Sequence, residues 1–227
     1  TAYGVSVITG AGLKEIKEGT AVYTKNGEED TLDGDAILLA TGRGPNTEGL
    51  HAERAGVELT KRGAVVTDKH LRTTAENIWA AGDVCGNLQF TYISLDDSRI
   101  ILSDMQGDGS RTTENRGAFA YSVFMEPSFS RAGLSEKEAA DKGLNYRVVR
   151  MNTDMIPKAK VLRKTAGMLK AVIDKDSGKI LGAALFCPES YEIINMVKLA
   201  MDHDLDYTVL RDFIYTHPTM SLSLIHI

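Results

Sequence analysis

The sequence predicts an α/β protein in two parts, and three features carry this prediction. Asp35–Gly42 is a continuous apolar run, typical of a strand buried on both faces. Ile78–Asp83 is a shorter apolar run that ends in Gly-Asp, where a carboxylate at a strand tip can accept hydrogen bonds from sugar hydroxyls. After the polar stretch Gln106–Asn115, hairpin-like strands and apolar helices follow, which favours an α+β second part.

Composition excludes several classes of protein. The 227 residues carry a net charge of -5, so they present no field that would attract nucleic acid or an anionic membrane. No apolar stretch is long enough to span a bilayer, and the start does not resemble a signal peptide. The two cysteines, Cys85 and Cys187, are far apart, and the five histidines show no ligand spacing. We therefore expect no metal site, no disulfide framework and a cytoplasmic location.

The first part contains several predicted strands. Val5–Ile8 and Ala21–Thr24 are rich in β-branched residues, and Asn26-Gly27 after them is a turn candidate. The buried strand Asp35–Gly42 precedes a glycine- and proline-containing loop. Ala64–Thr67 is predicted to be a short strand that leads into the Ile78–Asp83 strand.

A helix is predicted from Thr91 to Met105. Its apolar residues can share one face, with Asp96 and Asp97 on a solvated face outside; those apolar residues are Ile93, Ile100, Ile101 and Met105. The glycine-containing stretch Gln106–Asn115 after it is predicted to be a domain linker.

The second part reads as antiparallel strands plus helices. Tyr121–Phe124 is a strand candidate, and Ser135 with Glu138 three residues later is a capping-box signature. Two apolar runs flank Asp174–Gly178, which predicts a hairpin. A largely apolar helix is predicted over 193–201, and a second helix through Val209, Leu210 and Phe213.

Two glycine motifs are interpreted as ordinary turns. Gly10-Ala11-Gly12 has Glu15 where a third glycine belongs, and a carboxylate there would face the phosphates. Gly107-Asp108-Gly109 has Thr112 at the corresponding place. No dinucleotide fingerprint remains in the chain.

Three motifs in order give a family resemblance. Ala40-Thr41-Gly42-Arg43, the Gly82-Asp83 strand end and His217-Pro218-Thr219 together resemble the second half of a flavin-dependent pyridine nucleotide–disulfide oxidoreductase. This is the family of glutathione reductase, dihydrolipoamide dehydrogenase and mercuric reductase, and the resemblance spans nearly the whole chain. It implies an incomplete FAD/NAD(P)-binding Rossmann-like portion followed by an α+β dimerisation domain.

The resemblance also implies domain boundaries. Residues 1–46 are expected to be the C-terminal remnant of an NAD(P)-binding domain and 47–106 the C-terminal part of an FAD-binding domain. A linker at 107–116 and a dimerisation domain at 117–221 follow. Because the chain lacks an initiator Met, we expect it to begin mid-protein. The last six residues, 222–227, resemble the translation of a sequencing adapter, so the natural sequence is expected to stop at Ser221.

Cofactor contacts are carried over from the family residue by residue. The resemblance places the crossover Thr41, Gly42 and Arg43 beside bound dinucleotide; the alternative is a plain strand and turn. Asp83 is expected to accept hydrogen bonds from the ribityl chain of FAD, with the Gly82 backbone against the cofactor. The alternative is an N-cap or surface aspartate. Gln89, Phe90 and Thr91 lead into a helix whose positive N-terminus would face the flavin, with the Thr91 backbone in contact.

His217 is the implied catalytic residue. In the family this histidine reaches the active site from the partner subunit and moves protons, for which an imidazole near neutrality is suited; the alternative is an ordinary loop. The family has a glutamate nearby that orients the histidine, and Leu222 stands at the matching position. Cys85 and Cys187 are expected to be buried, inert thiols.

The implied parent is a homodimer that passes electrons from NAD(P)H to FAD, then to a redox disulfide and a small-molecule or disulfide substrate. The first FAD fingerprint, the nicotinamide fingerprint and the CxxxxC disulfide are absent here, so this chain alone is expected to be inactive. Phe90–Asp97 and Met155–Lys160 look closest to a bacterial branch that handles reactive chlorine and hypothiocyanous acid. A non-enzymatic dimerisation module and a ferredoxin-type flavin reductase remain as alternatives, as does the choice between NADH and NADPH.

Overall fold

The computed structural model describes residues 4–227 of the chain. The chain divides into two compact units, Thr1–Asn46 and Thr47–Ile227. Each unit is built by its own sheet, and each is described by itself below.

The first unit is an antiparallel meander of three strands. Its strands are β1 (Ala11–Lys17), β2 (Thr20–Lys25) and β3 (Glu28–Asp33), in the order β1-β2-β3. The predicted strand at Ala21–Thr24 and the turn after it are therefore confirmed. Asn26 and Gly27 both adopt positive φ, 54° and 86°, as a two-residue hairpin turn requires. Ala11 and Gly12, which the sequence placed in a turn, begin β1 instead.

Two predicted strands of this unit do not form. Val5–Ile8 and Asp35–Gly42 have no strand structure, and Leu38 is 90% exposed. The prediction was wrong because a continuous apolar run becomes a buried strand only when neighbouring strands flank it. No strand among residues 4–227 pairs with either segment.

The second unit opens with a stretch of turns held by a few pairings. It contains two short 3₁₀ turns, η1 (Ala52–Ala55) and η2 (Gly82–Cys85). The predicted strands Ala64–Thr67 and Ile78–Asp83 shrink to single bridges, Leu59 with Val65 and Arg72 with Trp79. Both strand predictions were wrong, because each run meets its partner at one residue only.

Helix α1 (Thr91–Gln106) confirms the predicted helix. Ile93 and Ile100 are buried, and Ile100 packs with Leu71 and Cys85. Met105 is 55% exposed, so the expectation that it shares the buried face was wrong.

The segment before η2 is tied to α1 by one buried carboxylate. Asp104 accepts from the Trp79 indole at 2.8 Å and from two Arg72 nitrogens at 2.7 Å each. Only 4% of the Asp104 side chain is exposed. A bidentate guanidinium–carboxylate pair of this kind fixes orientation as well as distance. The segment that carries Arg72 and Trp79 is therefore held in a defined position against α1.

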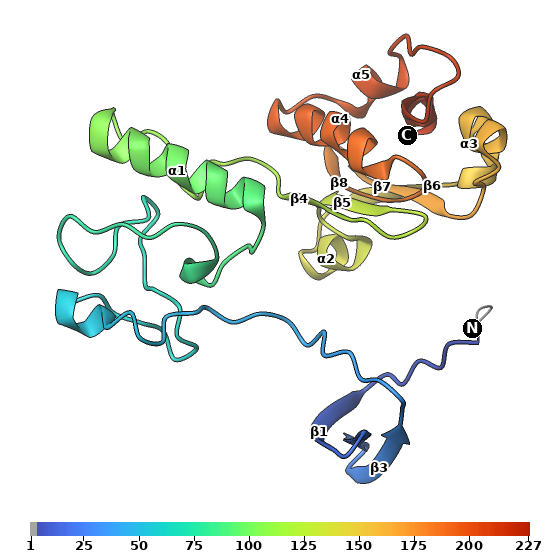
Figure 1. The fold of residues 1–227 in the computed structure, drawn as a ribbon. Coiled ribbons are helices and arrows are strands. Elements are labelled where there is room, and N and C mark those ends of the chain that lie inside the picture. Colours follow the sequence, from blue (N-terminus) through green and yellow to red (C-terminus); the bar gives the residue numbers. More distant parts are fainter. Residues whose placement is uncertain (1–3) are drawn as a thin grey trace. The chain divides into compact units, whose positions relative to one another are not determined.

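The rest of the unit is an antiparallel five-stranded sheet with helices on both faces (Figure 1). The strand order is β4-β5-β8-β7-β6, with β4 (Ala120–Val123), β5 (Phe129–Gly133), β6 (Tyr146–Asn152), β7 (Met168–Asp174) and β8 (Ile180–Phe186). One face carries α4 (Ser190–Asp202) and α5 (Tyr207–Arg211), and the other carries α2 (Glu136–Asp141). The remaining elements are η3 (Thr153–Met155), α3 (Pro157–Leu162) and η4 (Ser221–His226). The predicted strand, the hairpin and the first helix of an α+β unit are confirmed. The second predicted helix forms as α5, but it ends at Arg211, so Phe213 lies outside it.

The main core lies between this sheet and α4. It includes Ile173 and Leu185 from the sheet with Ile193 and Val197 from the helix. Leu224 in η4 is 3% exposed and belongs to the same core. This packing does not test whether residues 222–227 belong to the natural sequence, so their non-native origin stays a prediction.

The capping box is confirmed in full. Ser135 accepts from the Glu138 amide at 3.1 Å, and Glu138 accepts from the Ser135 amide at 2.6 Å. These two bonds start α2 at the residue that the sequence indicated.

Candidate functional site

The Gly82–Asp83 turn is packed directly against the start of α1. Gly82 is buried and has φ 75°, and a side-chain carbon built on it would lie 2.6 Å from the Ser94 hydroxyl. Glycine therefore fits here for two reasons, its left-handed backbone and its lack of a β-carbon. Asp83, the next residue, is exposed beside the first turns of the helix.

Asp96 and Asp97 are buried, so the prediction of a solvated face was wrong. They are 9% and 3% exposed. Asp97 accepts from the Gly82 amide at 2.8 Å and from Arg116 at 2.7 Å. Asp96 pairs with Arg111 and, at 3.5 Å, with the Arg116 Nε. The two carboxylates thus face inward because two guanidinium groups meet them there.

The N-terminus of α1 keeps free donors. Phe90 is the N-cap in extended conformation, and no side chain caps the helix. The amides of Ile93 and Ser94 bond to the Phe90 carbonyl at 2.9 and 3.1 Å. In the described part of the chain, no acceptor bonds to the amides of Thr91 and Tyr92. No acidic residue lies in the first turn, so the positive end of the helix dipole is available to an acceptor from outside.

Phe90 and Gln89 are half-buried at this helix start. The Phe90 ring lies 5.4 Å from Tyr92 and 5.5 Å from Phe119, measured between ring centroids. The Tyr92 hydroxyl donates to the Ala120 carbonyl. The aromatic contacts therefore join the helix start to the strand that opens the five-stranded sheet.

Two clefts flank α1. One of about 350 Å³ is lined by Asn87, Leu88, Ile93, Asp97, Thr113 and Arg116. The other, of about 320 Å³, includes Tyr92, Asp96, Arg99 and Arg111 in its wall. Arg116 borders both clefts, so it stands between them.

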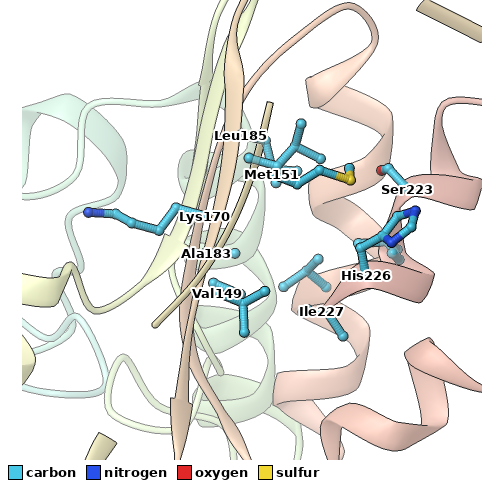
Figure 2. Close-up of a pocket in the computed structure, with 12 residues that line it drawn as sticks. Val149, Met151, Lys170, Ala183, Leu185, Ser223, His226 and Ile227 are labelled. Carbon is cyan, nitrogen blue, oxygen red and sulfur yellow. The ribbon is translucent and has the colours of Figure 1, made fainter. Parts of the chain in front are cut away.

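A third, apolar cavity lies between the sheet and the C-terminal segment (Figure 2). Its walls include Val149, Met151 and Leu185 from the sheet, with Ser223 and Ile227 from the C-terminus. Its volume is about 30 Å³. A space of that size has room for no more than about two water molecules and excludes a substrate.

The two thiols are buried, as predicted. Burial raises the pKa of Cys85 to about 11, with the nearby Asp97 carboxylate adding to the effect. Burial likewise raises the pKa of Cys187 to about 12. Neither group is a nucleophile near neutral pH.

Thr41, Gly42 and Arg43 lie in the first unit, in the segment that forms no strand. All three are exposed, and Gly42 has φ 104°. The close approach of backbone that the sequence predicted at a strand end is thus replaced by an open chain.

His217 is exposed in the segment between α5 and η4. Among residues 4–227, no hydrogen bond or ion pair reaches its imidazole. Leu222, at the position of the expected glutamate, donates its amide to the Thr219 hydroxyl at 3.3 Å and supplies no carboxylate. Nearby, Ile214 is 92% and Phe213 56% exposed.

The sequence reasoning missed Arg111 and Arg116. Both lie in the stretch assigned to a polar linker, so their charges looked solvated. A signal was present: two adjacent carboxylates in one helix are followed within 20 residues by two arginines, but no helical spacing relates them.

Comparison with known proteins gives two family matches. Residues 1–98 match the model described as pyridine nucleotide-disulphide oxidoreductase. Residues 119–225 match the dimerisation domain of pyridine nucleotide-disulphide oxidoreductases. No helix within residues 4–227 has both the length and the apolar character needed to cross a membrane.

Individual relatives agree. The chain is 48% identical over 221 residues to the probable pyridine nucleotide-disulfide oxidoreductase RclA of Escherichia coli, covering 97% of this chain and 50% of that protein. It is 33% identical to a mercuric reductase of Staphylococcus aureus, covering 99% of this chain and 42% of that one. A solved Cu(II) complex of the HOCl-induced flavoprotein disulfide reductase RclA from E. coli matches with a TM-score of 0.84 at 47% identity, covering 93% of this chain and 47% of the other. The chain spans about half the length of the curated relatives it matches.

Proposed function

Because this chain belongs to the pyridine nucleotide–disulfide oxidoreductase family, we propose that it is the C-terminal half of an FAD-dependent NAD(P)H oxidoreductase acting on a disulfide or a sulfur-directed oxidant. The observation that carries this proposal is the Gly82–Asp83 turn fixed beside the uncapped start of α1. It sets an exposed carboxylate next to free backbone donors.

The donor set fits a flavin nucleotide. A carboxylate at Asp83 accepts hydrogen bonds from the hydroxyls of a sugar-alcohol chain. The amides of Thr91 and Tyr92 can donate to ring oxygens and nitrogens, and the positive helix end favours negative charge there. Gly82 keeps the turn flat against the helix, which leaves Asp83 facing outward. Gln89 and Phe90, half-buried, directly precede these donors in the sequence and are proposed as further contacts.

FAD, when bound, would supply hydride acceptance from NAD(P)H and electron delivery to a redox disulfide. Thr41, Gly42 and Arg43 remain proposed dinucleotide contacts of the first unit. The chain itself would contribute orientation: Asp83 would hold the sugar-alcohol chain, and the backbone amides of Thr91 and Tyr92 would donate to the flavin ring.

His217 of a second copy would hold and release the proton needed when a disulfide is reduced. An exposed imidazole is within reach of a partner's reacting groups and can both accept and donate a proton. The neighbouring Ile214 and Phe213 are exposed apolar side chains of the kind that a subunit interface covers. The match to a dimerisation domain supports the same homodimer.

The test uses the complete protein of which this chain forms the C-terminal half. We expect a dimer that carries one FAD per chain and consumes NADH or NADPH when a disulfide or hypothiocyanous acid is added. The 227-residue chain alone is expected to show no turnover. A dimer that binds no flavin would overturn the proposal and support a non-enzymatic dimerisation module instead.

A further inference from the structure

A buried carboxylate beneath the Gly82–Asp83 turn has no part in the function proposed so far. Asp97 is 3% exposed, and its two oxygens have different partners. One accepts from the Gly82 amide at 2.8 Å, and the other accepts from Arg116 at 2.7 Å. The same side chain therefore holds the turn and binds a cation.

The backbone that follows Arg116 is held by helix α4, which packs on the five-stranded sheet. The Ala118 amide donates to the Asp202 carboxylate of α4 at 2.7 Å. Gly117 has φ 82°, and a β-carbon there would lie 2.5 Å from an Asp202 oxygen. The backbone just after Arg116 therefore packs tightly against α4. This packing fixes the position of the Arg116 backbone, from which its side chain extends to Asp97.

The charges balance within this cluster. Asp96 and Asp97 carry two negative charges, and Arg111 and Arg116 carry two positive charges. Only 15% of the Arg116 side chain and 5% of the Asp97 side chain are exposed, so solvent screens this pair weakly. A buried carboxylate without its cation would project its full charge toward its surroundings.

Those surroundings include the proposed flavin contacts. Asp97 lies six residues after Thr91, which is about 9 Å along the axis of an α-helix. We propose that Asp97 and Arg116 form a positioning and charge-balancing pair for the flavin. Asp97 fixes the Gly82–Asp83 turn, and Arg116 cancels the negative charge that would otherwise oppose the positive start of α1. This inference rests on the proposed function.

The electrostatic half is tested by the midpoint potential of the flavin in the complete holoprotein. Arg116→Gln leaves the Asp97 charge uncancelled, so the reduced, more negative flavin binds less tightly and the potential falls. Asp97→Asn keeps an acceptor for the Gly82 amide but leaves Arg116 in excess, so the potential rises. We expect a tenfold change in relative binding of the two redox states, which is about 30 mV for a two-electron couple. The double variant returns close to the starting potential.

Arg99→Gln is the matched control. It removes one positive charge from α1, the helix that carries Asp97, but at an exposed position, so the potential should barely move. An Arg116→Gln shift no larger than that of Arg99→Gln would overturn the charge-balancing role. If Arg116→Gln does not retain flavin, the direction of the potential shift in Asp97→Asn decides instead. A potential that falls or does not change in Asp97→Asn would refute the proposal.

The positioning half is tested without flavin, by hydrogen exchange in the 227-residue chain. Asp97→Ala should speed exchange of the Gly82 amide at least tenfold, while Asp97→Asn largely retains its protection. The Ala80 amide, which donates to the Leu71 carbonyl at 3.0 Å, is the internal reference. Equal protection of Gly82 in both variants would contradict the positioning role. If the unmodified complete protein holds no FAD at all, the proposed function has failed, whatever the exchange experiment shows.

Discussion

Gly82 and Ser94 are in such close contact that a single added methyl group would not fit between them. A β-carbon on Gly82 would lie 2.6 Å from the Ser94 hydroxyl oxygen and 3.2 Å from its β-carbon. The turn that presents Asp83 therefore depends on a residue without a side chain, packed against one with a short side chain.

Gly82→Ala should destabilise the 227-residue chain by more than the backbone cost alone. Placing alanine at φ 75° costs about 1–2 kcal/mol, and the clash with Ser94 adds to this. Gly143→Ala is the matched control, because Gly143 has φ 65° and nothing within 4 Å of a β-carbon. Urea unfolding measures both variants. Ser94→Ala should partly rescue Gly82→Ala, and equal losses for the two glycine variants would show that the contact does not matter.

The capping box of α2 gives a prediction for pH. The Ser135 amide bonded to the Glu138 carboxylate holds the pKa of Glu138 down at about 2, against 4.5 unperturbed. A lowered carboxyl pKa stabilises the fold above the unfolded value, and this contribution is lost as pH falls from about 4.5 toward 2. Glu138→Gln should flatten the fall in stability across that window. An unchanged pH profile would argue against the capping bond in solution.

Ser135→Ala tests the other half of the box. Loss of an N-cap hydroxyl costs about 1 kcal/mol at any pH near neutrality. Urea unfolding at pH 7 measures it. Ser135→Asp, which restores an acceptor, is the control and should recover most of the loss.

Local signals such as this box could be predicted from sequence because all their partners lie within one helical turn. The hairpin at Asp174–Gly178 and the helices α1 and α4 could be predicted for the same reason. The periodicity of their apolar residues and the identity of their turn residues are sufficient to indicate them. β1 and β3 were missed because all their residues are exposed and neither strand shows a regular alternation of apolar and polar residues.

Features that depend on distant partners could not be predicted. Asp35–Gly42 has the composition of a buried strand, but no described strand flanks it. Asp96 and Asp97 looked solvated because their counter-ions, Arg111 and Arg116, lie 15 and 19 residues away in what resembled a linker. A single sequence shows the charges but not their meeting point.

The buried thiols should be unreactive in the folded chain. With pKa values raised to about 11 and about 12, Cys85 and Cys187 should hold roughly a hundredfold and a thousandfold less thiolate at pH 8 than a thiol with a pKa of 9.0. Labelling with a chromogenic disulfide reagent should be slow for the native chain and should reach two thiols per chain in urea. Rapid labelling of the native chain would show that one thiol is accessible.

His217→Gln in the complete protein should lower turnover by about 10²–10⁴-fold, as loss of an acid–base group does. Flavin content and dimer formation should stay unchanged, because no hydrogen bond or ion pair within residues 4–227 involves its imidazole. His203→Gln, at the end of α4, is the control and should retain turnover. Full activity in His217→Gln would remove this residue from the mechanism.

The affinity of the complete apoprotein for FAD, measured with and without Asp83, tests the role of the Gly82–Asp83 turn most directly. One or two hydrogen bonds to a charged acceptor contribute about 1.5–3 kcal/mol each, so Asp83→Ala should weaken FAD binding at least tenfold. Glu76→Ala, which removes an exposed carboxylate of the same unit, should bind as the unmodified protein does. FAD affinity that is the same for Asp83→Ala and Glu76→Ala would contradict the assignment of this turn to the flavin.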